Sequence, residues 1–479
     1  MANGFLFDLN RCTGCQACAI ACTIENDLPF GSSWRRIDTY NEAKHPAAPA
    51  WHLSLACNHC ADAPCMSSCP ALAIRRDSVT GAVLIDQDSC IGCGYCVWAC
   101  PYDAPRFDAA DGVMRKCTFC NHRLREGLDP ACVSHCPTGA LGYGALDGAG
   151  KAGAVGASGT EPASGSDGRV AEVPGCPELG IGPAIRFTPL KDDRTRPSLD
   201  AEGTSPPAMA PRAGAAQSAI TLRGEWPLVL FTLIAATLVA LVIGAAAGAV
   251  TPPPGVFLAS ALFGMGLGTM HLGRKERAWR TVLNVRRSWL SREIVLYSAF
   301  VAVTTVWLRF APDSAPAAAA SCLLGLGALF AVDRVYDVTG RRLTGRLHSA
   351  DVILTGPFLA ALLLLNPALA ALAGAAKLML YLWRKLRNAS NEGEARSSVS
   401  VLRIGMGLLA PAVLWLYDPA QLQAGIIGCA AIGEFIDRCE FYAELETRTP
   451  RRQMAVHLRE SLPGRPAPAA PMAGPAAAR

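Results

Sequence analysis

The chain has 479 residues, 51% of them hydrophobic, and a formal net charge of +5 at pH 7. A chain of this length is too long for one ordinary hydrophobic core, and its apolar residues are unevenly spread, so regions of different class are expected. The net charge is modest and says little by itself, and no nucleic-acid partner is expected.

Sixteen of the twenty cysteines lie between Cys12 and Cys136, in four groups. The groups are Cys12, Cys15, Cys18 and Cys22; Cys57, Cys60, Cys65 and Cys69; Cys90, Cys93, Cys96 and Cys100; Cys117, Cys120, Cys132 and Cys136. The third group, CIGCGYCVWACP, has the spacing with which a ferredoxin loop binds one 4Fe-4S cluster through three thiolates and a neighbouring cluster through the fourth. Sixteen ligands at four per cluster predict four 4Fe-4S clusters.

Disulfide bonds and structural zinc are the two alternatives to iron-sulfur clusters. The start of the chain has neither a basic segment before an apolar run nor a twin arginine, so export is not expected and the cysteines should stay reduced. Structural zinc usually takes two cysteine pairs separated by a longer spacer, without a third cysteine at the next two-residue step. Iron-sulfur binding is therefore favoured. Four isolated cysteines are predicted to serve packing: Cys176, Cys322, Cys429 and Cys439.

The cysteine-rich region, residues 1–145, is predicted to be an α+β ferredoxin-like domain. Segments such as AVLIDQDSC mix short β-favouring runs with Asp and Gly turns, as small hairpins do. Because the clusters would replace much of the hydrophobic core, the domain should fold only with them. Residues 146–222 are rich in Gly, Ala and Pro and predict a linker, within which residues 173–190 should dock on the cluster domain as an extended strap.

Long apolar runs from Trp226 onward predict an all-α polytopic membrane domain over residues 223–444, with eight transmembrane helices. Only Asn366 and Pro367 separate the fifth predicted span from the sixth. The expected spans are residues 226–250, 255–272, 291–310, 316–335, 350–365, 367–386, 399–417 and 420–437. Residues 445–479 are predicted to be a disordered cytoplasmic tail.

Charge predicts the orientation of these spans. Basic residues cluster after the second, fourth and sixth spans, whereas the intervening turns, such as TPPP at 251–254, contain no Lys or Arg. Positively charged loops stay in the cytoplasm. The cysteine-rich domain and both termini are therefore expected on the cytoplasmic side of a bacterial inner membrane.

His271 and Glu293 lie at the cytoplasmic edge of the second and third predicted spans, joined by a basic amphipathic segment. A quinone needs a hydrogen-bond partner and a group that exchanges protons near neutral pH, and these residue types supply both. Two structural alternatives stay open: His271 caps the end of one helix, and Glu293 favours the positive N-terminus of the next.

The four cysteine groups resemble those of the iron-sulfur subunit of the dimethyl sulfoxide reductase family, a membrane-bound group of molybdopterin oxidoreductases. The stretch MHLGRKERAWRTVLNVRRSWLSREI, residues 270–294, and EFIDRCEFYAE from Glu434 resemble the membrane anchor of the same family. These are normally separate chains and are fused here. The resemblance implies a nested pairing of the cysteines into four sets: Cys12, Cys15, Cys18 and Cys136; Cys22, Cys117, Cys120 and Cys132; Cys57, Cys60, Cys65 and Cys100; Cys69, Cys90, Cys93 and Cys96.

The resemblance also implies a function. The cysteine at Cys93, where some relatives have tryptophan, implies that all four clusters are of the 4Fe-4S type, and the positions of His271 and Glu293 imply quinol binding. The chain would pass electrons between menaquinone or ubiquinone and a separate molybdopterin-containing catalytic subunit of the S-oxide, N-oxide or sulfite type. No substrate-reducing active site of its own is expected. The alternative is a stand-alone membrane protein that couples ferredoxin to quinone without a molybdenum partner.

Overall fold

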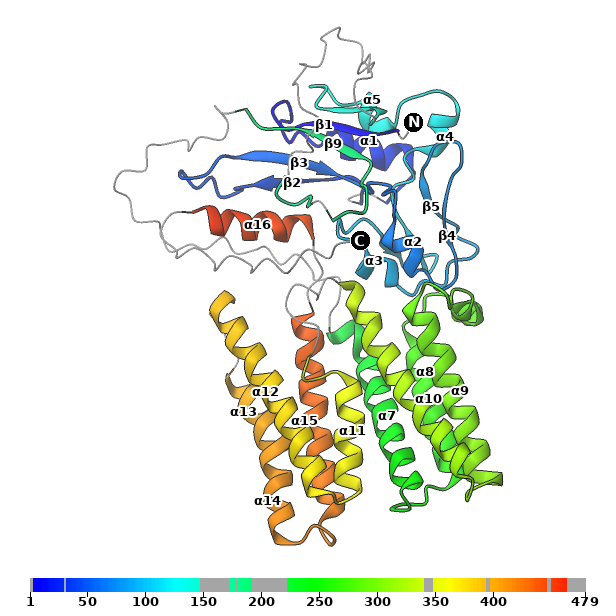
Figure 1. The fold of residues 1–479 in the computed structure, drawn as a ribbon. Coiled ribbons are helices and arrows are strands. Elements are labelled where there is room, and N and C mark those ends of the chain that lie inside the picture. Colours follow the sequence, from blue (N-terminus) through cyan, green and yellow to red (C-terminus); the bar gives the residue numbers. More distant parts are fainter. Residues whose placement is uncertain are drawn as a thin grey trace, which may run out of the picture.

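The computed structural model describes residues 3–29, 32–146, 173–177, 179–191, 222–339, 348–392, 397–445 and 449–462. An N-terminal domain of short strands and helices lies on one end of a set of long helices (Figure 1). Most of the predicted linker, including residues 147–172 and 192–221, lies outside the described residues.

The strands of the N-terminal domain form one three-stranded sheet and three two-stranded hairpins. In the sheet, ordered β8-β1-β9, the central strand pairs antiparallel with β8 and parallel with β9. The sheet strands are β1 (Asn3–Asp8), β8 (Leu141–Ala145) and β9 (Ile185–Thr188); the hairpins are β2 (Arg36–Tyr40) with β3 (Trp51–Leu55), β4 (Ile74–Arg76) with β5 (Val83–Ile85), and β6 (Arg106–Asp108) with β7 (Val113–Arg115). The segment predicted as a strap thus adds the strand β9 to the sheet.

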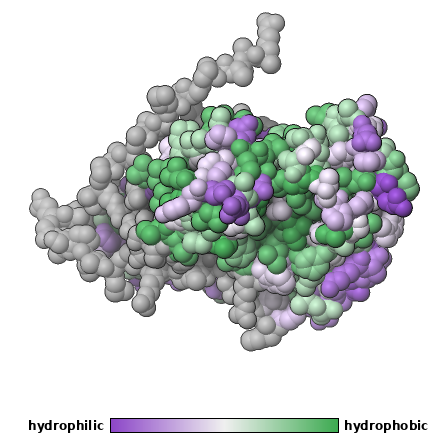
Figure 2. Space-filling view, turned by 90° about the horizontal axis from the view of Figure 1, so that it is seen from below, coloured by the Kyte–Doolittle hydropathy of each residue, from purple (hydrophilic) through white to green (hydrophobic). Residues whose placement is uncertain are grey.

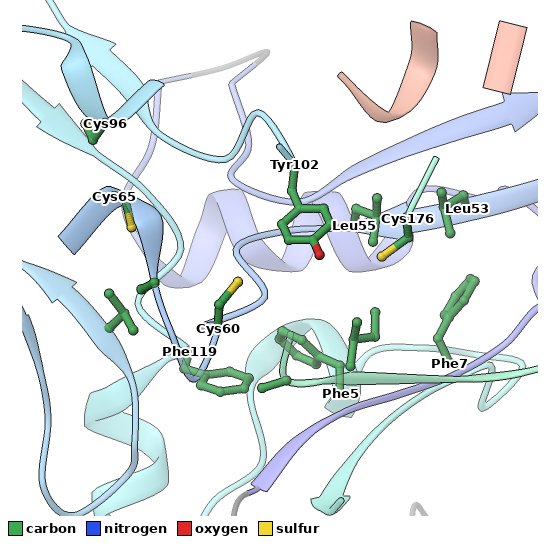
Figure 3. Close-up of a cluster of buried hydrophobic side chains, with 14 of the residues drawn as sticks. Phe5, Phe7, Leu53, Leu55, Cys60, Cys65, Cys96, Tyr102, Phe119 and Cys176 are labelled. Atoms are coloured by element: carbon green, nitrogen blue, oxygen red, sulfur yellow. The ribbon is translucent and has the colours of Figure 1, made fainter. Parts of the chain in front are cut away.

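Each short helix of this domain starts within or just after a cysteine-rich loop. These helices are α1 (Ala17–Glu25), α2 (Pro64–Ser68), α3 (Tyr95–Ala99), α4 (Asn121–Arg125) and α5 (Ala131–Ser134). The turn before α3 requires glycine, because Gly92 has φ of +68° and a Cβ there would lie 2.3 Å from the Gly112 carbonyl oxygen. Cysteines and aromatic rings share the domain core, where Cys60 lies between Tyr102 and Phe119 (Figure 3).

The helical domain consists of long helices that run roughly side by side (Figure 1). They are α7 (Leu222–Ala246), α8 (Pro254–Met270), α9 (Trp289–Phe310), α10 (Ala315–Val335), α11 (Val352–Leu363), α12 (Pro367–Glu392), α13 (Ser397–Ile404), α14 (Ala410–Tyr417) and α15 (Gln423–Glu444). A π-helical turn at Gly405–Leu409 joins α13 to α14. Seen from the end opposite the N-terminal domain, hydrophobic residues dominate the surface (Figure 2).

Length and composition identify four membrane spans among the described helices: Gly224–Ala246, Trp289–Phe310, Ala315–Val335 and Val399–Tyr417. The number becomes five if α8 and the 3-10 helix η1 (Lys275–Val282), which meet at 107°, count as one span. Helix α11 has only 12 residues, and α12 and α15 carry several charges, so none of the three passes this test. Composition thus supports fewer spans than the eight that were predicted.

The predicted disordered tail is wrong for part of its length. Residues Pro450–Ser461 form a helix, α16, which runs beneath β2 and β3 (Figure 1). Its Met454 and Leu458 are buried in the core of the N-terminal domain, and the Tyr40 hydroxyl lies 2.9 Å from Nδ1 of His457. Apolar residues spaced four apart give the segment a buried face, and that face is missed when only its overall polarity is considered.

Candidate functional site

The sixteen grouped cysteines come together in four sets, each combining cysteines from two distant parts of the chain. We number the sets from the helical domain outward. Site I contains Cys69, Cys90, Cys93 and Cys96; site II contains Cys57, Cys60, Cys65 and Cys100; site III contains Cys22, Cys117, Cys120 and Cys132; site IV contains Cys12, Cys15, Cys18 and Cys136. All four cysteines line a common cavity at sites I, III and IV. These are the sets that the family resemblance implies.

The backbone around the cysteines supplies hydrogen bonds to sulfur. At site I the N–H groups of Ala73 and Met114 donate to the sulfurs of Cys69 and Cys90, at 3.3 and 3.4 Å. Similar bonds of 3.5 and 3.4 Å reach a cysteine of site II and a cysteine of site III. Such bonds stabilise the negative charge of thiolates that bind metal and tune a bound cluster.

Burial makes several of these thiols poor thiolates on their own. Burial, followed by the neighbouring cysteines, raises the pKa of Cys93 to about 12, and burial likewise raises the pKa of Cys132 to about 11. Since a thiolate is the form that binds metal, these sites need a strong positive charge at their centre to ionise. The donor set therefore fits a metal group better than a set of free thiols.

The geometry disfavours a single zinc ion. Thiolates around one zinc lie about 3.8 Å apart, given a Zn–S bond of about 2.3 Å and tetrahedral geometry. In the described part of the chain, no group of three or more His, Cys, Asp or Glu side chains is arranged to hold a single ion. In a four-iron cluster each thiolate binds a different iron, so cysteines spread around a cavity suit it.

The four sites follow one another across the domain. Cys96 of site I has Cys65 of site II among its electrostatic neighbours, and Cys117 of site III has Cys57 of site II. Sites III and IV adjoin, since Arg35 has Cys117 of site III and Cys18 of site IV among its charged neighbours, and Cys15 of site IV is exposed. The arrangement therefore leads from the helical domain to the opposite surface of the N-terminal domain.

Residues 271–288, between α8 and α9, pack directly on the loops of site I. Gly273 approaches Gly112 so closely that a Cβ at Gly273 would lie 2.1 Å from the Gly112 carbonyl oxygen. Arg277 donates to the Cys90 carbonyl at 3.1 Å, and Asn284 donates to the Cys69 carbonyl at 2.9 Å. One end of the helical domain is thus fixed to the backbone of two site I cysteines.

The structure places His271 and Glu293 in this same region without joining them. His271 occupies the C-cap position of α8, and its Nδ1 is buried without a hydrogen-bond partner among the described residues. This position agrees with its structural alternative. Glu293 is 8% exposed, and its strongest charged neighbours are Arg438 and Asp333. Because Glu293 lies beyond the first turn of α9, the helix-terminus alternative is wrong for this residue.

A buried ionic network in the second half of the helical domain was not predicted from the sequence. Lys377 of α12 pairs with Glu434 of α15 at 2.9 Å, and Arg403 of α13 bridges Glu434 and Asp437 at 3.2 and 3.1 Å. These four side chains are at most 1% exposed. The signal available in the sequence was the helical spacing of Glu434, Asp437 and Glu440 inside an apolar run, which places all three on one face.

Two known families match this chain, one in the N-terminal domain and one in the helical domain. Residues 50–146 match the 4Fe-4S dicluster domain, and residues 222–369 match the anchor subunit of dimethyl sulfoxide reductase. The chain therefore has an iron-sulfur domain followed by a helical membrane anchor.

Individual relatives match the N-terminal part. The sequence is 41% identical over 153 residues to the B subunit of anaerobic dimethyl sulfoxide reductase from Haemophilus influenzae, and 43% identical over 152 residues to the B subunit of that enzyme from Escherichia coli K12. Each of these matches covers 30% of this chain and 74% of the relative. The thiosulfate reductase electron transfer subunit of Salmonella typhi is 46% identical over 147 residues, covering 30% and 75%.

Proposed function

Because this protein belongs to the dimethyl sulfoxide reductase family, as its iron-sulfur subunit fused to its membrane anchor, we propose that it passes electrons between membrane quinone and a separate catalytic subunit. The observation that carries this proposal is the attachment of residues 271–288 to site I. This attachment brings the segment that begins at His271 against the backbone of Cys69 and Cys90.

The sixteen cysteines would hold four 4Fe-4S clusters, one at each site. When bound, the clusters supply one-electron redox chemistry. The protein's own residues bind them through the thiolates, donate backbone hydrogen bonds to sulfur and exclude water, since most cysteines of sites I to III are buried. The exposed cysteine of site IV, Cys15, favours the surface around that site as the docking place of the catalytic partner. A molybdopterin enzyme is the partner that the family favours.

At the membrane edge, His271 and Glu293 would handle the quinone. The buried Nδ1 of His271 makes no hydrogen bond of good geometry to a described residue, although the Gly268 carbonyl acts on the imidazole, so this atom would be available to hydrogen-bond a quinone oxygen. Glu293 is buried near the same loops and forms no ion pair with another described residue, so it would accept or supply the proton that accompanies each electron. Menaquinone and ubiquinone both offer such oxygens.

The membrane domain is proposed to have eight spans, with the iron-sulfur domain on the cytoplasmic side. Helices α12 and α15 have 26 and 22 residues, long enough to cross a bilayer, and several of their charges pair inside the protein, away from lipid. Helix α11 is short but packs against both of them. The basic segment after α8 contacts the iron-sulfur domain, which supports the cytoplasmic assignment of that domain.

Reduction of the clusters by quinol tests this function. In isolated membranes, a quinol analogue should reduce the clusters of the unaltered protein. Electron paramagnetic resonance would detect this reduction. The variant His271→Ala should lose this reduction, while dithionite still reduces all clusters. Lys275→Gln, at an exposed residue of the same segment, is the control and should behave as the unaltered protein. Quinol reduction that survives in His271→Ala would contradict the assigned quinone site.

Purification in mild detergent tests the partner. A co-purifying large subunit that contains molybdenum is expected. A protein that purifies alone and transfers electrons from reduced ferredoxin to quinone would instead support the stand-alone alternative.

A further inference from the structure

Two positively charged side chains are buried inside the iron-sulfur domain without a carboxylate. Lys116 is 3% exposed and Arg35 is 1% exposed. Neither forms an ion pair with an Asp or Glu in the described ranges of the chain, although other arginines of the domain, such as Arg36 and Arg115, do. A buried charge without a counter-charge is costly, so an opposite charge is expected close to each of them.

For Lys116 the available counter-charge is cysteine sulfur. Its ammonium donates to the backbone carbonyls of Val83 and Cys117, the latter at 3.3 Å. The charged groups that act on this ammonium are the sulfurs of Cys57, Cys65 and Cys117, and no carboxylate is among them. Cys57 and Cys65 belong to site II and Cys117 belongs to site III. The ammonium therefore lies between two neighbouring sites.

Arg35 occupies the next gap. Its strongest charged neighbours are Cys132 and Cys117 of site III and Cys18 of site IV. The guanidinium donates to the Ser54 hydroxyl at 3.1 Å, and that hydroxyl lies 3.5 Å from the Cys18 sulfur. Its Nε and Nη2 are buried without a hydrogen-bond partner among the described residues.

Site I differs from the sites further along. The strongest charged neighbours of Cys93 and Cys96 are other cysteines. The buried cations thus lie in the two gaps that are remote from the helical domain.

We propose that Lys116 and Arg35 set the reduction potentials of the clusters on either side of them, Lys116 at sites II and III and Arg35 at sites III and IV. This inference rests on the proposed function, because it requires clusters at these sites. A reduced cluster carries one more negative charge than the oxidised cluster, and a fixed positive charge nearby stabilises the reduced form. The effect is strong because both cations are shielded from water and salt.

The two cations would stabilise the reduced form of the clusters at sites II to IV, whereas Arg277, which contacts the Cys90 carbonyl of site I, is only partly buried. Lys116 and Arg35 do not bind the clusters; they act on them only through their charge.

Redox titration of the purified full-length protein, followed by electron paramagnetic resonance, tests the inference. Lys116→Met should shift two of the four midpoint potentials to more negative values, with at least a tenfold loss in each one-electron reduction equilibrium constant, which is about 59 mV. Lys116→Arg, which keeps the charge, should restore both potentials. Lys44→Met removes the same charge from an exposed loop and should leave all four unchanged.

Three outcomes are decisive. Four unchanged potentials in Lys116→Met, or an equal shift of all four, would overturn the inference while the clusters themselves stand. Absence of four-iron signals from the unaltered protein would overturn the proposed function instead. If Lys116→Met fails to assemble its clusters, Lys116→Gln provides the measurement, because its amide can still donate to the Val83 and Cys117 carbonyls.

Discussion

Removing the charge of Glu434 is expected to destabilise the helical domain strongly. Its carboxylate accepts from Lys377 at 2.9 Å, from Arg403 at 3.2 Å and from the Thr355 hydroxyl at 2.7 Å. Glu434→Gln removes the charge of this residue while keeping its size and polarity. Among the described residues, the hydrogen-bond acceptors left to Lys377 are then neutral, namely the Ser349 carbonyl, the Thr355 hydroxyl and the new amide oxygen, while Asp437 stays a charged neighbour.

Removing one partner of a fully buried ion pair costs about 3–5 kcal/mol, because the other charge stays buried without compensation. For a domain of about 150–250 residues, each kcal/mol lowers the melting temperature by about 2–4 °C. Glu434→Gln should therefore lower it by roughly 6–20 °C. Lys377→Met should cost less, since Glu434 would still pair with Arg403.

Circular dichroism melts in one mild detergent, at one scan rate, would measure these shifts. The double variant Glu434→Gln with Lys377→Met removes one charge of each sign and leaves Arg403 paired with Asp437 at 3.1 Å. It should be more stable than Glu434→Gln alone. A double variant whose loss equals the sum of the two single losses, within about 0.5 kcal/mol, would refute the argument, because side chains that form a pair do not act independently.

Three further predictions concern the iron-sulfur domain. Cys93→Ser should change one of four cluster signals in electron paramagnetic resonance, and an unchanged spectrum would contradict its place in site I. Met454→Asp should detach α16 from β2 and β3 and speed proteolysis of the C-terminal segment, whereas Arg459→Asp, at an exposed residue of the same helix, should not. Anaerobic removal of iron by a chelator should unfold the domain, seen as loss of its ellipticity; an apo domain that keeps its fold would show that the clusters are not needed for folding.

Local sequence determined the chemistry of the N-terminal domain and the general class of the rest. The spacing of three cysteines in CIGCGYCVWACP is itself the geometry of a cluster loop, so it can be read without a fold. The long apolar runs likewise required a membrane environment, because a backbone in lipid must satisfy its own hydrogen bonds. Span boundaries such as 291–310 agree with the helix Trp289–Phe310 within two residues.

Contacts between distant residues were decided only by the tertiary structure. Which fourth cysteine joins each set depends on how loops far apart in the sequence meet, as those of Cys12 and Cys136 do, and spacing alone leaves that open. The burial of Lys116 could not be read from RKCTFC, where its neighbour Arg115 is partly exposed and paired with Asp108.

The same limit applies to the helical domain. The sequence predicted spans over residues 367–386 and 420–437 but did not show how their charges are compensated. Only the packing of α12 on α15 showed that Lys377 pairs with Glu434 and Arg384 with Asp437. Helical periodicity and cysteine spacing involve residues that are close in the chain, so they can be recognised in the sequence. Charge compensation and ligand pairing act through space, so they become visible only when the protein is folded.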